Sequence, residues 1–283
     1  MQVLRAILFM TASMACLALS DLFIKLSAQS LPPGQVMFFL SLGGTLLFML
    51  IAALRGIPLV SPAFWHPTVM SRNLAEVLAA LGMVTGIAWT PLPMVAAIMQ
   101  TTPLLVTLGA ALFLGERFGP RRAFGVVAAL VGALVIIRPG TEVFSPAAFL
   151  PLIAATGYAT FILLTRKVGH DEDPRTSLLY AALLGAIVTS VIVPFFWTVP
   201  GPKEIALMLA IGALGALGQL FLIQAVRFAE ASAIAPFSYV GLLIAAIWGA
   251  LVFGEYPDLA TWIGGAIIVA SGLYIWHRER AAP

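Results

Sequence analysis

The stretch ALFLGERFGPRR at residues 111–122 is repeated in outline by ALVFGEYPDLAT at residues 250–261. In both copies, an apolar segment ends in Gly-Glu and is followed by a short loop and a further apolar segment. The copies lie 139 positions apart in a chain of 283 residues, so each takes the same place in one half of the sequence. This spacing indicates an internal repeat.

The correspondence continues without a gap as far as residues 139 and 278. Apolar segments often match one another by chance, so the shared Gly-Glu and the equal loop lengths carry the comparison. We therefore expect two repeats, residues 1–140 and residues 141–283. The identical pairs are Ala111/Ala250, Leu112/Leu251, Gly115/Gly254, Glu116/Glu255, Gly125/Gly264, Leu134/Leu273 and Ile136/Ile275.

The composition places the chain in a membrane. Hydrophobic residues make up 61% of the sequence and charged residues 10%, against roughly 25% charged residues in soluble domains. The mean hydropathy of +1.05 agrees. A soluble protein of this composition would lack the polar atoms to cover its surface, so we predict an integral membrane protein. The single Cys16 excludes an internal disulfide bond.

Ten apolar runs approach or reach the roughly 20 residues that a helix needs to cross a bilayer. Short separators rich in proline, glycine or charge divide them, so consecutive helices are expected to be antiparallel neighbours. The predicted fold class is an all-α membrane protein with ten transmembrane helices. The runs are 6–24, 36–54, 74–89, 94–114, 123–137, 147–164, 177–197, 205–226, 231–253 and 259–276.

The basic residues divide unequally between the loops. With the N-terminus in the cytoplasm, only Lys25, Arg138 and Lys203 of the 15 Lys and Arg residues fall outside. This asymmetry follows the positive-inside rule and explains the net charge of +3 without a nucleic-acid partner. We expect a multi-pass protein of the inner (cytoplasmic) membrane with both termini cytoplasmic. The residues on the inner side are Arg5, Arg55, Arg72, Arg117, Arg121, Arg122, Arg166, Lys167, Arg175, Arg227, Arg278 and Arg280.

Because five is an odd number, the second half enters the membrane in the opposite sense to the first. The first Gly-Glu loop then faces the cytoplasm and is followed by three arginines, whereas the second faces outward and has none. The chain is therefore predicted to contain two five-helix repeats of inverted topology. Such repeats are a recurrent plan of secondary transporters, in which two similar halves give alternating access to a central site.

A different interpretation of the first helix is a secretory signal peptide. A basic residue, an apolar run and Ala18-Leu19-Ser20 precede Asp21, which is the pattern of a cleavage site. Cleavage there would leave nine helices and break the repeat.

Ten helices, a five-plus-five inverted repeat and Gly-Glu after the fourth and ninth helices resemble the drug/metabolite transporter superfamily, of the EamA type. The resemblance covers nearly the whole chain. Three motifs are similar to a subgroup that includes bacterial S-adenosylmethionine uptake carriers, and riboflavin carriers and amino-acid exporters share the implied fold. These motifs are Ser20-Asp21-x-x-x-Lys25, Ala235-Pro236-x-x-Tyr239 and Phe253-Gly254-Glu255-x-Pro257-Asp258. One departure is Leu40, which stands near the place of an Arg in many relatives.

Ionisable residues inside a bilayer are costly and suggest function by default. Asp21 and Lys25 are four residues apart, so they share one helical face and could pair with each other. They are interpreted either as a substrate-binding or gating pair at the outer mouth, or as an ordinary ion pair whose lysine reaches the outer head groups. Glu76 is either the partner of Arg72 at a helix start, or a site for a proton or a substrate cation.

Uncharged polar residues lie deeper in the predicted helices, where they either join helices by hydrogen bonds or contact substrate. Together they predict a polar cavity lined by helices 1, 3, 4, 6, 8 and 9. Pro103 leaves a backbone carbonyl group unpaired and is expected to kink the fourth helix. Pro103 and, in the ninth helix, Pro236 are candidates for a gating or structural role. The candidate substrate-binding residues, in addition to Asp21, Lys25 and Glu76, are Gln100, Thr101, Tyr158, Gln219, Gln224, Ser238 and Tyr239.

Glu116 and Glu255, which end the repeated helices, are expected to bond helix ends or neighbouring loops, with gating as the alternative. The glycines of GALGALGQ (212–219) lie inside an apolar run with no preceding strand, so they indicate helix packing and not a phosphate loop. His66, His170 and His277 lack the spacing of metal ligands. We expect no metal, no cofactor and no catalytic residue.

The sequence therefore predicts a secondary transporter that moves a small polar organic metabolite by alternating access. S-adenosylmethionine-like, vitamin-like and amino-acid-like substrates all remain open. The expected partners are this small molecule, the lipid bilayer and a coupling proton. The alternatives are an exporter of amino acids or toxic amphiphilic compounds, a membrane-embedded enzyme, and a scaffold with a densely packed apolar centre.

Overall fold

The computed structural model describes residues 2–54, 56, 62–115, 119–142, 144–168, 174–229 and 234–280. In these ranges, the regular structure consists of helices only. Short 3₁₀ helices are η1 (Pro62–Trp65), η2 (Pro146–Phe149), η3 (Val193–Phe196) and η4 (Ala235–Tyr239). The α-helices are α1 (Gln2–Ser27), α2 (Pro33–Leu54), α3 (Pro67–Trp89), α4 (Leu92–Met99), α5 (Thr102–Phe113), α6 (Pro120–Ile137), α7 (Leu150–Val168), α8 (Pro174–Ile192), α9 (Pro202–Phe228), α11 (Val240–Phe253) and α12 (Leu259–Arg280).

The predicted fold class is confirmed, with α4 and α5 forming the fourth crossing and η4 and α11 the ninth. Eight helical segments of the described chain are long and apolar enough to cross a membrane, and residues 122–137 of α6 form a shorter apolar helix. The third crossing, α3, begins at Pro67 and is longer than the predicted run 74–89. Its first turns carry polar residues such as Arg72, which the apolar run left out.

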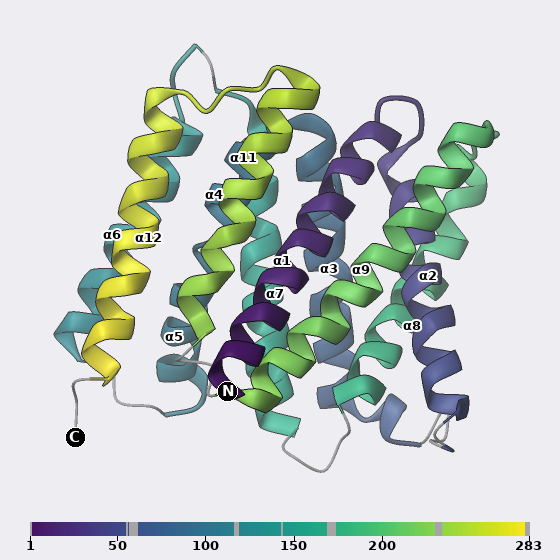
Figure 1. The fold of residues 1–283 in the computed structure, drawn as a ribbon, viewed down its shortest axis with the longest axis horizontal. Coiled ribbons are helices and arrows are strands. Elements are labelled where there is room, and N and C mark those ends of the chain that lie inside the picture. The colour runs from purple at the N-terminus through teal and green to yellow at the C-terminus, as the bar shows by residue number, and fades with distance from the viewer. Residues whose placement is uncertain are drawn as a thin grey trace.

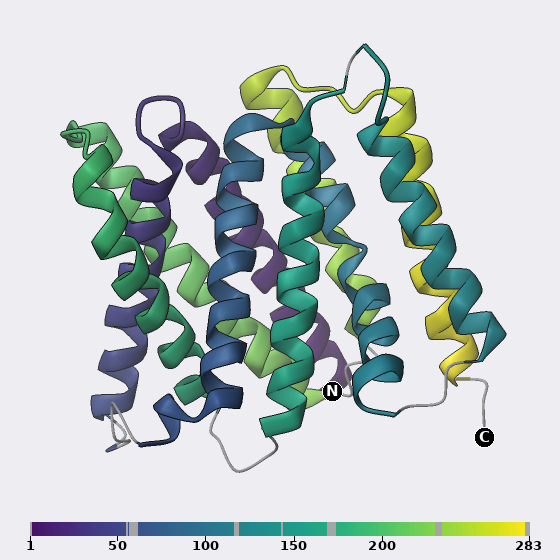
Figure 2. The ribbon, with the colours of Figure 1, turned by 180° about the vertical axis from the view of Figure 1, so that it is seen from behind.

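Packing between the halves follows the inverted repeat. In chain order, α1 corresponds to α7 and α3 to α9. In the structure, α1 packs along α9 and α3 packs along α7, which are equivalent contacts, while α2 meets α8 and α6 meets α12 (Figures 1 and 2). Each half therefore inserts its first helix against the third helix of the other half.

The repeated glycine has the same backbone conformation in both copies. Gly115 has a φ of 69° and Gly254 a φ of 67°. This left-handed region favours glycine, because a Cβ atom would clash with the backbone there. The repeated glycine thus follows a helix end in both repeats, since α5 stops at Phe113 and α11 at Phe253.

The fourth and ninth crossings are irregular at equivalent places. The fourth is interrupted at Gln100 and Thr101, immediately before Pro103, and the ninth has 3₁₀ geometry up to Tyr239. The interruption therefore lies next to Pro103, where a kink was predicted. Gln100 and Tyr239 are separated by the 139 residues of the repeat, so both halves break their regular helix at corresponding positions.

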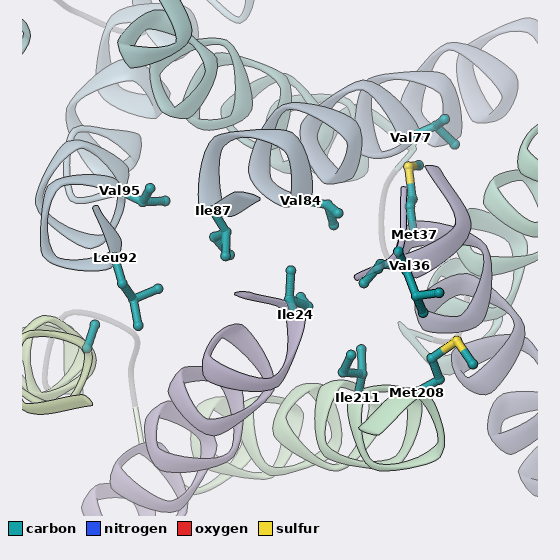
Figure 3. Packing of buried hydrophobic residues seen from close by; sticks show 12 residues of the cluster. Ile24, Val36, Met37, Val77, Val84, Ile87, Leu92, Val95, Met208 and Ile211 are labelled. Atoms are coloured by element: carbon teal, nitrogen blue, oxygen red, sulfur yellow. The ribbon is translucent and has the colours of Figure 1, made fainter. Parts of the chain in front are cut away.

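Both termini lie at the same end of the bundle (Figure 1). Toward the opposite end, buried apolar side chains from helices of both halves pack together (Figure 3). We call this group the apolar plug. Its members are Ile24, Leu31, Val36, Met37, Val77, Val84, Ile87, Leu92, Val95, Met208, Ile211 and Ala245.

Candidate functional site

A cavity of about 910 Å³ lies between the two halves. Every helix that the sequence predicted contributes side chains to it, and so do α2, α8, α12 and the start of α6. An interior of this size contradicts the scaffold alternative, which required a solidly packed centre. The polar residues of the lining are Ser20, Asp21, Ser41, Glu76, Gln100, Thr102, Thr107, Arg122, Tyr158, Arg166, Gln219, Ser238 and Tyr239.

The two ends of the cavity differ. Toward the termini, the lining includes Arg122 in the first turn of α6, Arg166 in the last turn of α7 and Trp276 near the end of α12. These helix ends all lie on the side of the bundle that carries both termini (Figure 2). At its other limit, the lining includes Ile24 and Val84, which belong to the apolar plug. The cavity therefore reaches one end of the bundle and is closed toward the other.

Two carboxylates line the cavity at different depths in the bundle. Asp21 lies six residues before the end of α1, on the side of the apolar plug. Glu76 lies nine residues after the start of α3. This places it roughly 13 Å along the helix from the end of the bundle that carries both chain termini. Its Oε2 atom is buried and has no hydrogen-bond partner among the described residues. A buried oxygen without a partner is costly, so this atom is suited to a proton or a ligand donor.

Tyr158 of α7 supports the wall next to Glu76. Its hydroxyl group lies close to the side chain of Gln219 and to the carboxyl group of Glu76. The ring stacks on Phe161, with a centroid distance of 6.0 Å and an interplanar angle of 12°. Tyr158, Glu76 and Gln219 come from α7, α3 and α9, so the helix pairing between the halves brings them together.

The structure corrects the pairing expected for Lys25. Its Nζ atom donates hydrogen bonds to Glu255 Oε1 and, at 2.8 Å, to the carbonyl oxygen of Thr90. Lys25 is 8% exposed, so it neither pairs with Asp21 nor reaches toward head groups. The reason is that Glu255 approaches from the loop after α11, a contact that the spacing within α1 could not reveal.

The other candidates divide between lining and non-lining positions. Gln100, Pro103, Pro236, Ser238 and Tyr239 line the cavity. Thr101 was predicted to bind substrate, but it does not line the cavity. It is fully buried, and its hydroxyl group donates a 2.8 Å hydrogen bond to the carbonyl oxygen of Ile98. Gln224 lies on α9 but is not part of the lining. Glu116 lies outside the described residues.

Sequence reasoning missed the two arginines at the mouth and the methionines of the wall. Arg122 and Arg166 were attributed to membrane orientation alone, although both also line the cavity. Their position in the turns nearest the terminal end was the available signal. Methionine is flexible and polarisable, which suits walls that contact varied ligands. The lining methionines are Met10, Met14, Met37, Met83 and Met99.

Glu255 and Asp258 hold the loop between α11 and α12. Glu255 Oε2 accepts a hydrogen bond of 2.9 Å from the backbone N–H of Leu92, at the start of α4. Asp258 accepts a 2.8 Å bond from the backbone N–H of Thr261 and pairs with Arg138. Partial burial opposes ionisation of Asp258, but the bonds from Thr261 and Arg138 outweigh it and hold the pKa of its carboxyl group below the usual range. This loop is thereby tied to the first repeat at two points.

The profile of the EamA-like transporter family matches residues 4–138 and 145–276. The chain belongs to the EamA-like transporter family. This membership agrees with the crossed packing of two five-helix halves around a central cavity, and it makes the chain a multi-pass membrane transporter. The suspected relation to the drug/metabolite transporter superfamily is confirmed.

Characterised relatives in this family carry different names. The chain is 35% identical to a riboflavin transporter of Rhizobium johnstonii over 213 residues, which cover 74% of this chain and 70% of the relative. It is 30% identical to an S-adenosylmethionine uptake transporter of Rickettsia felis over 219 residues, covering 75% and 74% of the two chains. It is 32% identical to the pseudopaline exporter CntI of Pseudomonas aeruginosa over 254 residues, covering 88% and 87%.

A solved crystal structure shares the fold. It superposes with a TM-score of 0.59 and 20% sequence identity, over 100% of this chain and 98% of its own. The named relatives are transporters of small metabolites, and they include both uptake and export proteins.

Proposed function

We propose that this EamA-family protein is a secondary active transporter for a small organic metabolite that carries a positive charge. The substrate enters the central cavity, and the two five-helix halves then close the mouth and open the plugged end. With both termini in the cytoplasm, as the distribution of basic residues favours, the described state is open to the cytoplasm.

The observation that carries this proposal is the presence of two carboxylates, Asp21 and Glu76, in the wall of a membrane-embedded cavity. The cavity of about 910 Å³ is within the range of roughly 300–1,000 Å³ that pockets for small organic ligands occupy. Inside a low-dielectric wall, a carboxylate attracts a cation far more strongly than in water. The arginines of the lining lie at the mouth, which leaves the deeper polar wall acidic.

This charge pattern favours one of the substrate types found among the relatives. S-adenosylmethionine carries a sulfonium and an ammonium group, both of which suit the acidic wall, and its adenine ring can pack on Tyr158, Tyr239 and the methionines. Riboflavin is uncharged and gains less from two carboxylates. We therefore propose an S-adenosylmethionine-like cation as the substrate class, with vitamin-like and amino-acid-like compounds as the competing classes.

Glu76 is proposed to carry the coupling proton. Its orphaned Oε2 atom has room for a proton when the substrate is absent, and a cationic substrate would displace that proton. The substrate and the proton would then compete for the same carboxylate, so only one of them binds at a time. Such competition is the minimum requirement for exchanging one for the other. The proton gradient would supply the driving force.

The test is transport by the purified full-length chain in proteoliposomes. Radiolabelled S-adenosylmethionine, riboflavin and a panel of amino acids are supplied with and without a pH gradient. We expect gradient-dependent accumulation of S-adenosylmethionine and its loss in the Asp21→Asn/Glu76→Gln double variant. Accumulation of riboflavin alone, unaffected by the double variant, would overturn the assignment of a cationic substrate.

Export is the second candidate, and one observation favours it. The pseudopaline exporter matches a larger share of this chain, 88%, than the riboflavin transporter or the S-adenosylmethionine uptake transporter does. Orientation-sorted proteoliposomes separate the two directions. Transport from the side of the termini to the opposite side under the physiological gradient would establish export.

A further inference from the structure

A second, smaller pocket lies beyond the apolar plug. Its volume is about 370 Å³, and none of its lining residues lines the central cavity. Ile24, Ile87 and Leu92 of the plug (Figure 3) are sequence neighbours of residues that line this pocket. We call it the plug-side pocket. Its lining consists of Lys25, Ala28, Gln29, Ala88, Trp89, Thr90, Pro91, Phe253 and Glu255.

The floor of the plug-side pocket is the ion pair between Lys25 and Glu255. The Lys25 side chain is 10% exposed and that of Glu255 is 23% exposed, so both charges are largely withdrawn from solvent. Lys25 Nζ also binds the carbonyl oxygen of Thr90 and lies 5.2 Å from the centroid of the Phe253 ring. Glu255 Oε2 binds the backbone N–H of Leu92 at 2.9 Å.

These contacts join the two repeats at the closed end. Lys25, Thr90 and Leu92 belong to the first half, and Phe253 and Glu255 to the second. Opening this end by moving the halves apart separates Lys25 from Glu255. Removing one partner from a buried ion pair leaves an uncompensated charge, which is strongly unfavourable. A ligand that supplies both missing charges would relieve this cost.

We propose, building on the transport function proposed above, that the plug-side pocket binds the α-amino-acid group of a zwitterionic ligand and that this ligand opens the closed end by replacing the Lys25–Glu255 pair. The carboxylate of the ligand pairs with Lys25, and its ammonium group pairs with Glu255. Both groups sit on one carbon atom, so their charges are separated by about the same short distance as a contact ion pair. The exchange leaves neither protein charge unpaired.

The rest of the pocket fits such a ligand. Trp89, which is 63% exposed, and Phe253 both line the pocket, so their rings offer apolar surface for a side chain. Gln29 adds an exposed amide at the rim. A ligand with only one charge would leave either Lys25 or Glu255 without a partner, so it is expected to bind without opening this end.

The test measures opening directly, by cysteine labelling of the full-length chain in proteoliposomes. Cys16→Ser removes the single native cysteine, and Ala96→Cys introduces a probe that lines the cavity and packs against the plug. A membrane-impermeant maleimide is added on the side opposite the termini, and orientation is read from a tag at the C-terminus. The ligand probes are L-methionine, 3-(methylthio)propylamine and 4-(methylthio)butanoate, which carry both charges, only the positive one and only the negative one.

We expect L-methionine to accelerate labelling about fivefold or more and the two single-charge compounds to leave the rate unchanged. Glu255→Gln and Lys25→Met should raise the rate without ligand and abolish the response to L-methionine. Lys203→Gln, at an exposed lysine in the first turn of α9, is the control and should behave as the parent. Equal acceleration by a single-charge compound, or no response of the parent protein to L-methionine, would overturn the proposal.

Failure of this proposal is distinguishable from failure of the transport function. Gradient-driven uptake in the same proteoliposomes, without any effect of L-methionine on labelling, refutes the pocket alone. Zwitterion-dependent labelling without uptake of any metabolite tested refutes the transport assignment alone. The ligand series needs only the parent protein, so it decides the matter even where the charge variants fail to fold.

Discussion

Gly132 of α6 and Gly264 of α12 lie in direct contact. The backbone of each glycine occupies the space that a Cβ atom on the other would need. A Cβ on Gly132 would lie 2.8 Å from the carbonyl oxygen of Gly264, and one on Gly264 would lie 2.4 Å from the carbonyl oxygen of Gly132. The same helix pair brings Gly125 against Ile275, and Gly264 against Ile136. Gly125/Gly264 and Ile136/Ile275 are equivalent pairs in the sequence repeat, so the contact is reciprocal between the halves.

The first prediction concerns this contact. Gly264→Leu should separate α6 from α12 and lower the free energy of unfolding by about 1–3 kcal/mol, because extra atoms in a packed interface force backbone shifts. The melting temperature of the purified protein in detergent measures the effect. Gly34→Ala is the control, because a Cβ there meets nothing within 4 Å. Equal melting temperatures for the two variants would refute the role of the contact.

The second prediction concerns Glu76. Glu76→Gln should abolish the pH dependence of uptake, because the amide cannot take up or release the proposed coupling proton. The measurement is the initial uptake rate at several values between about pH 5 and pH 8. Transport assays are practical in this range, and changes of side-chain charge within it matter in cells. Glu142→Gln, an exposed residue of the loop after α6, should retain the parent profile. A Glu76→Gln variant with an unchanged profile removes Glu76 from coupling.

The third prediction concerns Asp21. Asp21→Asn should raise the apparent KM for a cationic substrate roughly tenfold or more, which corresponds to the loss of about 1.4 kcal/mol of binding free energy. The maximal rate should change less, because the asparagine preserves the shape of the side chain. Concentration-dependent uptake separates the two parameters. A KM equal to that of the parent protein would exclude Asp21 from the binding site.

The fourth prediction concerns Asp258 at the start of α12. Asp258→Ala should lower the free energy of unfolding by about 0.5–2 kcal/mol, since it removes the oxygen that caps the helix. Asp258→Asn should cost less, because it keeps the cap and loses only a partly exposed ion pair with Arg138. Thermal melting of both variants at neutral pH provides the comparison. A loss of equal size in both would assign the stability to the ion pair and not to the cap.

The pH dependence of the Asp258 contribution has a definite sign. Its pKa is lower in the folded protein than in the unfolded chain, so its stabilising effect is present above the ordinary aspartate pKa of about 3.9. The effect is lost as the pH falls through the lowered folded-state value. The difference in melting temperature between the parent and Asp258→Asn should therefore shrink below about pH 4. A difference that grows in acid would contradict this assignment.

Several site residues were predictable because they are polar within apolar runs. Asp21, Glu76, Gln100, Tyr158, Gln219, Ser238 and Tyr239 were selected in this way, and the structure places all of them in the cavity wall. Polarity alone does not fix the direction in which a side chain points. The hydroxyl group of Thr101 is bonded to a nearby backbone carbonyl group, and Gln224 lies outside the lining. Arg122 and Arg166 line the cavity, although they were attributed to membrane orientation alone.

The sequence by itself determined the membrane class, the ten helices and the inversion of the second half. These follow from quantities that are local in the chain, namely the lengths of apolar runs, the positions of helix-ending residues and the side on which basic residues fall. Only the tertiary structure decided the partner of Lys25, which is Glu255, 230 residues away. It also decided which end of the cavity is closed. Both depend on how ten helices rotate and cross, and the packing of distant helices against one another sets that geometry.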